Sequence, residues 1–319
     1  MTAVQAFHEG ERALQARAGM RARLEEIGPR VMRPFIPEQH RAFFAQLPCL
    51  VAGSIDAEGQ PWASVLAGPP GFVHAPDARE LRVNALPDPV DPLATVLRLG
   101  APIGLLGVEP PTRRRNRMNG VIGEVNRHGF SVQVRQSFGN CPKYIQARSA
   151  VFVGTEGGSP APTLRSEHLD AAARWIVQRA DTFFIATAHP AAQSDTSAAH
   201  GVDVSHRGGR PGFVRVDGND LLTVPDFSGN FFFNTLGNIA LHPRAGLVFI
   251  DFASGDLLQL AVAAEIVWDG PEVAAFEGAE RLLRLRVTAA LRRPAALPLR
   301  WGEAELSPHL VATGHWPCA

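Results

Sequence analysis

The chain carries the same short pattern twice, 141 residues apart. The run Gly-Pro-Pro-Gly-Phe-Val at residues 68–73 returns as Gly-Arg-Pro-Gly-Phe-Val at residues 209–214. This offset is far longer than the roughly 20–50 residues of a solenoid or propeller unit. It predicts a duplicated domain, so that one polypeptide can form the interface that a homodimer forms between two chains. The same correspondence links Ser64 with Ser205 and, with one extra residue, Gly104-Leu105-Leu106 with Gly246-Leu247-Val248.

Length and composition are those of a soluble globular protein with two domains. The 319 residues are 45% hydrophobic and 19% charged, which excludes a disordered or fibrous chain. The formal net charge is zero, so no electrostatic field favours nucleic acid or a membrane surface. No apolar run is long enough to span a bilayer and no secretory signal is visible, so we expect a cytoplasmic protein.

The cysteines exclude several kinds of site. Cys49, Cys141 and Cys318 are far apart and odd in number. They therefore predict neither a disulfide framework nor a structural zinc site, and they cannot hold an iron–sulfur cluster. We expect no metal site.

Short strands at close spacing, with one helix inserted in each half, favour small antiparallel barrels over a βαβ sheet. We expect a helical segment over residues 1–40, a first half over 41–153, a linker over 154–165 and a second half over 166–319. The expected helices cover residues 4–27, a segment opening at 37, 91–99, 166–179 and 234–241. The expected strands cover 49–55, 60–66, 71–73, 81–84, 103–108, 119–125, 129–136, 183–187, 202–207, 212–216, 221–224, 245–252 and 257–267.

Two polar clusters of the second half are candidates for an anion site. Ser-His-Arg-Gly-Gly at residues 205–209 ends one strand, and Asp-Phe-Ser-Gly-Asn at 226–230 precedes a helix that begins at Asn234 and Thr235. A helix N-terminus offers free N–H groups to a phosphate, and Arg207 could add a bidentate clamp. The alternative is that Asn234 or Thr235 only caps the helix while Arg207 faces solvent.

These clusters, with the run Asn-Thr-Leu-Gly-Asn-Ile at 234–239 and His-Pro-Arg-Ala-Gly-Leu-Val-Phe at 242–249, resemble the FMN-binding split barrel of the pyridoxamine 5'-phosphate oxidase-like superfamily. The implied fold is mainly β with peripheral α-helices: two tandem split β-barrels of the FMN-binding type, packed as an intramolecular pseudo-dimer. The helix start Phe233-Asn234-Thr235 replaces the usual Ser-Arg-Lys, which argues against pyridoxamine phosphate oxidase activity itself. The resemblance implies that the FMN phosphate or ribityl chain is contacted by Ser205, His206, Arg207, Asn234 and Thr235, with Asn230 nearby.

The first half would take the place of the dimer partner. Its last strand ends in a polar segment, residues 136–146, which holds the only lysine and the only tyrosine of the chain and resembles the Cys-x-Lys stretch of some flavin split barrels. We expect Asn140 and Lys143 to approach the flavin or its substrate; the alternative is a turn with Lys143 in solvent. The first half's own cofactor position, residues 88–94, carries two prolines and two carboxylates. These remove donors and repel phosphate, so we expect one flavin per chain.

The expected function is an FMN-binding flavin oxidoreductase with an unidentified redox substrate and no assigned catalytic residue. FAD or a deazaflavin could replace FMN. One alternative is a non-catalytic flavin or haem carrier, with His200 or His206 as axial ligand, and another is a structural duplicate with both sites lost. The expected partner is a small-molecule redox substrate or an electron-donor reductase, with a homodimer as a further option.

Two further charged runs are set aside as sites. The run 113–117, Arg-Arg-Arg-Asn-Arg, is interpreted as a solvated hairpin tip. The run 8–11, His-Glu-Gly-Glu, has no second histidine at helical spacing, which excludes a zinc protease motif. We expect it to tie the N-terminal helix to the barrel.

Overall fold

The N-terminal segment folds as separate helices rather than as the single helix predicted over 4–27. The computed structural model describes residues 5–154 and 162–317. Gly19, with φ of +68°, breaks the segment between the first two helices, and Pro29 lies inside the second. Gly28, also inside the second helix, allows close packing, since a Cβ there would lie 2.5 Å from the Phe7 ring. The helices are α1 (Glu9–Arg17), α2 (Arg21–Val31), α3 (Glu38–Ala45), α4 (Pro92–Val96), α5 (Ala171–Arg179), α6 (Asn234–Leu241) and α7 (Pro271–Ala274).

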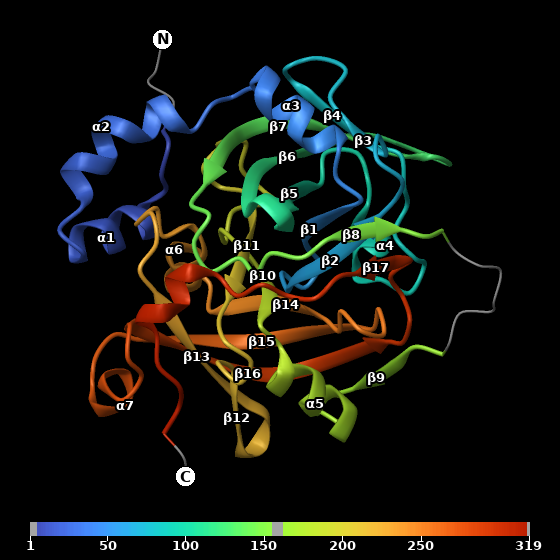
Figure 1. Ribbon diagram of the computed structural model, residues 1–319. Coiled ribbons are helices and arrows are strands. Elements are labelled where there is room, and N and C mark those ends of the chain that lie inside the picture. The colour runs from blue at the N-terminus through green and yellow to red at the C-terminus, as the bar shows by residue number, and fades with distance from the viewer. Residues whose placement is uncertain (1–4, 155–161, 318–319) are drawn as a thin grey trace.

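Two antiparallel sheets with the same strand order form the body of the molecule (Figure 1). The first runs β2-β1-β5-β6-β7-β4-β3 and the second β11-β10-β14-β15-β16-β13-β12. The first sheet contains β1 (Cys49–Ile55), β2 (Pro61–Ala67), β3 (Val73–His74), β4 (Glu80–Val83), β5 (Pro102–Glu109), β6 (Arg114–Asn126) and β7 (Gly129–Asn140). The second contains β10 (Thr182–Ala188), β11 (Val202–Gly208), β12 (Arg215–Asp217), β13 (Leu221–Phe227), β14 (Arg244–Ile250), β15 (Leu257–Val267) and β16 (Ala279–Arg293), with β9 (Leu164–Ser166) paired to β16.

The strand registers show that the sequence repeat is a structural repeat. Ser64 lies opposite β1 in the first sheet, and Ser205 lies at the same place opposite β10 in the second. Gly104 and Gly246 likewise occupy matching positions of β5 and β14. The predicted fold class, two tandem split β-barrels packed as an intramolecular pseudo-dimer, is confirmed.

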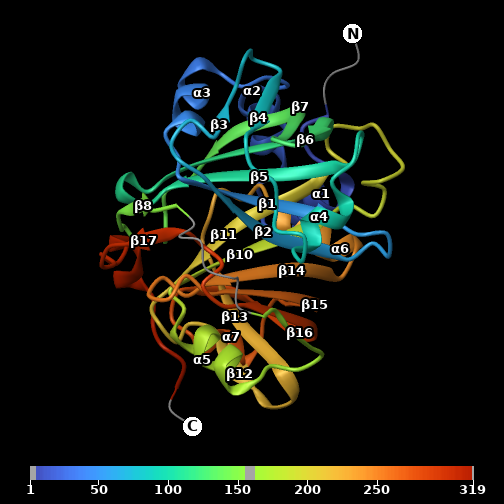
Figure 2. The same ribbon diagram turned by 90° about the vertical axis from the view of Figure 1, so that its right-hand side faces the viewer.

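The halves pack through equivalent strands on both sides, so the contact has pseudo-twofold symmetry (Figure 2). Strand β2 contacts β10, β14 and β15, while β11 contacts the equivalent β1, β5 and β6. A Cβ on Gly104 would lie 2.6 Å from the carbonyl oxygen of Val202, and one on Gly246 would lie 2.3 Å from that of Pro61. The two backbones therefore approach more closely than any side chain would allow.

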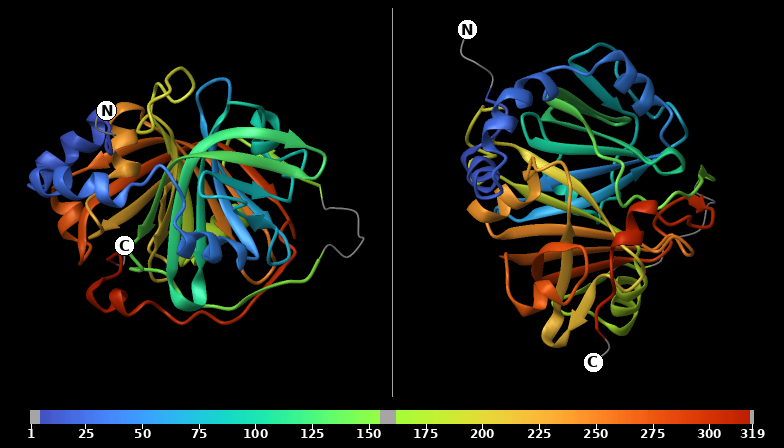
Figure 3. Two further views of the ribbon diagram at one scale, coloured as in Figure 1. Left: turned by 90° about the horizontal axis from the view of Figure 1, so that it is seen from above. Right: turned by 60° about the vertical axis from the view of Figure 1, so that its left-hand side comes forward.

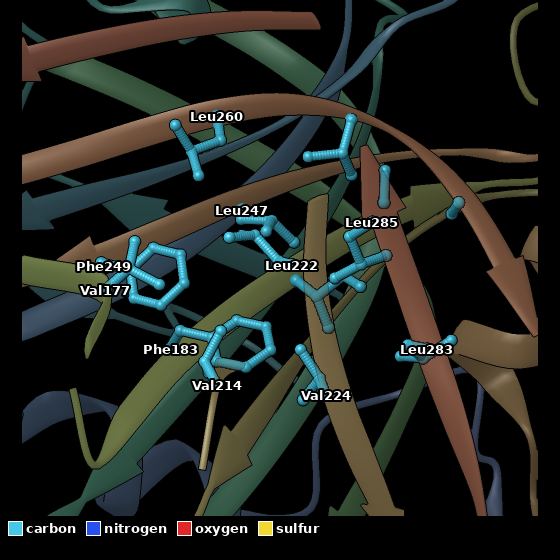
Figure 4. Close-up of a cluster of buried hydrophobic side chains, with 14 of the residues drawn as sticks. Val177, Phe183, Val214, Leu222, Val224, Leu247, Phe249, Leu260, Leu283 and Leu285 are labelled. Carbon is cyan, nitrogen blue, oxygen red and sulfur yellow. The ribbon is translucent and has the colours of Figure 1, made fainter. Parts of the chain in front are cut away.

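Each half has its own apolar core, and a third cluster joins them. Val51, Leu106, Phe184 and Val248 are among the buried residues of the joining cluster. Successive strand residues point to opposite faces, so in β1 Leu50 belongs to the core of the first half and Val51 to the joining cluster, and this part of the sheet is apolar on both faces. The core of the second half is drawn in Figure 4, where the labelled side chains are Val177, Phe183, Val214, Leu222, Val224, Leu247, Phe249, Leu260, Leu283 and Leu285.

Three further sequence-based expectations differ from the structure. The hairpin predicted over 119–125 and 129–136 extends from 114 to 140, so residues 114–117 belong to a strand and not to a solvated tip. The helix predicted over 166–179 begins at Ala171, because Asp170 caps it and residues 164–166 pair with β16 instead. Strand β16 itself was not predicted, although buried Leu283, Leu285 and Val287 alternate there with arginines at the period of a strand.

The expected linker lies between the two sheets in sequence. Its residues 155–161 lie outside the described part of the chain, as do residues 1–4 and 318–319, which include Cys318. On its N-terminal side β8 (Ala150–Phe152) pairs with β17 (Leu299–Trp301), so the ends of the two halves are joined by a short sheet. Among the described residues, no helix is both long and apolar enough to cross a membrane.

Candidate functional site

A polar cavity of about 100 Å³ lies between the halves, where the start of β6 and the end of β7 meet β11 and the start of α6. Both halves therefore contribute to one site. Figure 3 shows α6 beside the N-terminal helix α1 at one side of the molecule. The cavity is lined by Arg115, Arg117, Asn140, Cys141, Ser205, His206, Arg207, Asp226, Phe227, Gly229, Asn230, Phe231, Phe233, Asn234, Thr235, Leu236, Glu280 and Arg281.

Arg117 is a residue of the first half whose guanidinium contacts the second half. Its side chain is 5% exposed and forms an ion pair of 2.9 Å with Asp203. It also donates to Ser205 Oγ at 2.6 Å and to Asn234 Oδ1 at 2.8 Å. The prediction of a solvated hairpin tip is wrong here, because the carboxylate and the two polar groups of the other half accept this guanidinium inside the interface.

A second group of charges comes from the second half alone. Asp226 accepts from Arg207 at 2.5 Å and from Arg281 at 2.7 Å, one guanidinium on each of its oxygens. Arg281 also pairs with Glu280. The solvent-facing alternative for Arg207 is therefore not what the structure shows, since its charge lies against Asp226 at the cavity wall.

Arg115 has no carboxylate partner among the described residues. Its guanidinium donates to two backbone carbonyl oxygens, those of Cys141 at 2.7 Å and His206 at 3.4 Å. Burial, and then the charges of Arg117 and Arg207, lower the pKa of Arg115 to about 9. Four arginines line the cavity, and three of them are balanced by the carboxylates of Asp203, Asp226 and Glu280. The excess of positive charge on the wall is therefore that of Arg115.

The loop before α6 is held in an unusual conformation. Phe231 and Phe233 have φ values of +59° and +61°, a region that bulky residues rarely adopt. Phe232 between them packs against Phe7 and Phe138, and its N–H donates to Asn230 Oδ1 at 3.1 Å. The phenyl rings therefore fix the backbone from which the N-terminus of α6 enters the cavity wall.

His206 is buried in the cavity wall without hydrogen bonds to its ring. It is 6% exposed, and neither ring nitrogen has a partner among the residues described. Burial, and then Arg115 and Arg207, hold the pKa of His206 well below its usual value, so the imidazole is neutral. A neutral ring has one N–H donor and one lone pair for a ligand.

The structure brings the sequence-predicted site residues together. Lys143 is the exception, since it lines a neighbouring cavity of about 60 Å³ that shares Arg115, His206 and Arg207 with the first. Whether these residues bind a cofactor stays a prediction. The predicted residues that line the main cavity are Asn140, Ser205, His206, Arg207, Asn230, Asn234 and Thr235.

The side chains of Ser205, Asn234 and Thr235 are not free donors, because each is hydrogen-bonded to another side chain. Thr235 donates to Ser205 at 2.8 Å, and Asn234 donates to Glu11 of the N-terminal helix. The predictions missed Glu11 along with Arg115, Arg117, Arg281 and Glu280. The arginine-rich run at 113–117 was the available signal for two of these, because alternate residues of a strand face the same side.

The equivalent position in the first half is filled by its own side chains. Gln259, which is fully buried, donates to Ser64 Oγ and to Asp91, both at 3.2 Å. Arg293 pairs with Asp91 at 2.8 Å and with Asp88 at 3.2 Å. The two carboxylates that argue against phosphate binding there are thus neutralised by an arginine of the same chain.

The haem ligand candidate His200 lies elsewhere. Its ring stacks on His189 at 3.9 Å and its Nδ1 is 2.6 Å from Asp195. It lines a different cavity, together with residues of the loop at 192–201. Of the two histidines considered as haem ligands, only His206 lines the cavity between the halves.

The run 8–11 does connect the N-terminal helix to the second half. His189 Nε2 lies 3.1 Å from Glu9, and together with His8 these side chains are close enough to hold a metal ion. Nδ1 of each histidine, however, accepts a backbone N–H, from Gly10 and Ala191. The neutral rings therefore carry their proton on Nε2, which for His189 points to Glu9, while Nε2 of His8 has no hydrogen-bond partner in the described structure. A protonated Nε2 cannot bind a metal ion, so this is a hydrogen-bonded contact rather than a set of metal ligands.

Comparison with known proteins gives structural neighbours only. No protein-family model matches the sequence, and a comparison with curated proteins gives no match. A HupZ variant from Group A Streptococcus is 12% identical, with 39% of this chain and 98% of that chain covered and a TM-score of 0.30. A candidate pyridoxamine 5'-phosphate oxidase from Lactobacillus delbrueckii is 16% identical, with 40% and 97% covered and a TM-score of 0.31. HutZ, described as the haem storage protein of Vibrio cholerae, is 12% identical, with 40% and 95% covered and a TM-score of 0.27.

Proposed function

We propose that this chain binds FMN with its phosphate in the cavity between the halves, and that it works as a flavin oxidoreductase. The observation that supports this is the excess positive charge of the wall, above all Arg115, whose guanidinium has no carboxylate partner among the described residues. A dianionic phosphate would supply the missing charge and accept from several donors at once. Bound FMN would supply hydride or electron transfer at its isoalloxazine ring.

The size of the cavity fits a phosphate and not a whole flavin. An apolar cavity of about 150 Å³ accommodates one benzene, and this one measures about 100 Å³. The phosphate would lie against Arg115, Arg207 and the N-terminal residues of α6, and the ring system would extend beyond. The neighbouring cavity lined by Lys143, Tyr144 and Phe227 offers an aromatic wall on that side.

The residues of the chain would bind and orient the cofactor. Arg117 and Asp203 hold the first half against the second, which fixes the distance between the two walls. Asn140, whose amide nitrogen is buried without a partner in the described structure, would donate from the first half. His206 would present a neutral ring at the same wall, so it adds no charge to those that face the phosphate.

The test compares FMN, riboflavin and inorganic phosphate as ligands by fluorescence quenching and calorimetry. We expect FMN to bind at least tenfold more tightly than riboflavin, since hydrogen bonds to a charged group contribute about 1.5–3 kcal/mol. Arg115→Leu introduces the residue found at the equivalent position of the second half, Leu257. It should remove most of that preference, whereas exposed Arg98→Leu should leave it unchanged. Equal affinities of the wild type for FMN and riboflavin would overturn the phosphate site.

Turnover is tested separately on the loaded protein. If the chain is an oxidoreductase, bound FMN is reduced by NADH, by NADPH or by a reductase, and the flavin absorbance near its visible maximum bleaches and returns in air. A flavin that stays oxidised with every donor identifies a carrier protein instead.

Haem binding is the second candidate, and the unpartnered ring of His206 is the observation that favours it. A neutral imidazole nitrogen is the usual axial ligand of haem iron. Titration with haemin should shift and sharpen the Soret band in the wild type and not in His206→Phe, which keeps an aromatic ring but has no nitrogen ligand. A spectrum that is the same in both proteins would exclude His206 as the ligand.

A further inference from the structure

The N-terminal helix reaches the wall of the cavity through a close contact with α6. A Cβ on Gly10 would lie 2.4 Å from the carbonyl oxygen of Gly237, and one on Gly237 would lie 2.7 Å from the backbone and side chain of Glu11. The two helices therefore touch backbone to backbone. This contact places Glu11 directly behind the residues that line the cavity.

Glu11 is buried and hydrogen-bonded to the start of α6. It is 4% exposed, and one of its oxygens accepts from the backbone N–H of His8 at 2.8 Å. The other oxygen accepts from the side-chain amide of Asn234, whose own oxygen accepts from Arg117 at 2.8 Å. The amide of Asn234 is thus oriented from both ends, with its nitrogen toward Glu11 and its oxygen toward the guanidinium.

We propose that Glu11 is a positioning residue of the cavity, which fixes Asn234 against Arg117 and takes up a proton when an anion binds. The proposal rests on the proposed function in that the anion is the phosphate of FMN. Glu11 does not line the cavity, so its effect passes through Asn234 and through the electric field at the wall. The proton comes from the solvent and forms an O–H bond on the Glu11 carboxylate, and no other bond changes.

The charges around Glu11 explain why a proton would follow the anion. The groups that face it are His8 on its own helix, Arg117 on β6, Asp203 on β11 and the Asn234 amide on α6. Burial, opposed by the hydrogen bonds from His8 and Asn234, raises the pKa of Glu11 to about 8. A phosphate in the cavity adds negative charge and screens Arg117, so it raises this pKa further. Above pH 8, binding of the anion is therefore accompanied by the uptake of a fraction of one proton.

Calorimetry of FMN binding at pH 8.5, in two buffers with different ionisation enthalpies, measures this proton. At that pH the phosphate is fully ionised, because its second pKa is about 6. We expect the wild type to take up a fraction of one proton per FMN and Glu11→Gln to take up less. The control Glu9→Gln, a carboxylate on the same helix that is half exposed, should behave as the wild type.

The effect on Asn234 is measured by affinity at pH 6.5. Glu11→Gln keeps an oxygen acceptor for the Asn234 amide, so FMN affinity should stay within about threefold of the wild type. Glu11→Leu removes the acceptor and should weaken binding more than tenfold, with circular dichroism as the check that the protein is folded.

The outcomes separate this proposal from the proposed function. If the wild type does not bind FMN, the proposed function fails and the proton coupling fails with it. If FMN binds but the wild type takes up no proton, or Glu11→Gln takes up as much, the coupling alone is wrong. Equal affinities of Glu11→Leu and the wild type would show that Glu11 does not position Asn234.

Discussion

Arg117 and Gln259 occupy equivalent positions in the two sheets, and each reaches from its own half into the other. Arg117 pairs across the ladder with Leu106, and Gln259 pairs with the matching residue Val248. Arg117 donates to Ser205, and Gln259 donates to Ser64, the other serine of the repeat. One duplicated position has thus become an arginine beside an open cavity and a glutamine inside a filled one.

Replacing Arg117 should destabilise the junction of the halves. Arg117→Gln introduces the residue of the equivalent position but leaves Asp203, which is 4% exposed, without its guanidinium. Loss of one partner of a buried ion pair costs about 3–5 kcal/mol. Urea denaturation should show a loss of this size, and part of it should return in the double variant with Asp203→Asn. A loss below about 1 kcal/mol, comparable with exposed Arg98→Gln, would contradict this account.

Closeness of the halves makes a methyl group at the paired glycines unfavourable. Gly104→Ala and Gly246→Ala each direct a Cβ at a backbone carbonyl oxygen of the opposite half, 2.6 and 2.3 Å away. We expect each substitution to destabilise the protein by about 1–3 kcal/mol, the usual cost of overpacking. Gly201→Ala is the matched control, since a Cβ there meets nothing within 4 Å and its melting temperature should hardly change. Unchanged melting temperatures for all three variants would disprove the close contact.

Stability should fall from pH 5 to pH 9 in part because of Glu11. The pKa of this carboxyl rises from 4.5 to about 8 on folding, so between these values the folded state holds a proton that the unfolded state has released. The free energy of unfolding therefore decreases as pH rises through this window. Glu11→Gln removes this pH-dependent part of the free energy of unfolding. Between pH 5 and pH 9 that part amounts to several kcal/mol, with about 5 kcal/mol as the upper limit. Urea denaturation at pH 5, 7 and 9 measures it, with exposed Glu58→Gln as the control; parallel pH curves for wild type and Glu11→Gln would refute it.

One flavin should bind per chain. The position equivalent to the cavity is filled in the first half by Gln259 and Arg293, which are bonded to Ser64 and Asp91. FMN released from purified, saturated protein should therefore equal the protein in a ratio of about one. A ratio near two would mean that Arg293 leaves its carboxylates to admit a ligand.

Local patterns were enough to predict many of the elements. The bounds of β1 and α6 agree with those expected from the sequence, because apolar runs and turn residues within a few positions define them. The polar clusters at 205–209 and 226–235 also lie in the candidate site as expected. Whether they hold FMN is a question that the ligand experiments answer.

Long-range pairing decided the rest. From the sequence, the run 113–117 looks like a polar tip because its main counter-charges are far away in the chain. The second half supplies Asp203 to Arg117 and Glu305 to Arg113. Glu11 and Asn234 are 223 residues apart, and their contact depends on how α1 packs on α6.

The sequence by itself determined the duplication and the alternation of its strands, since these depend on periodicity and on residues close together in the chain. Only the tertiary structure decided which of the two equivalent positions stays open. The reason is that the deciding residues act between segments far apart in the chain, where burial and charge are set by partners that no local pattern identifies. These residues are Arg117, Gln259, Glu11 and Arg293.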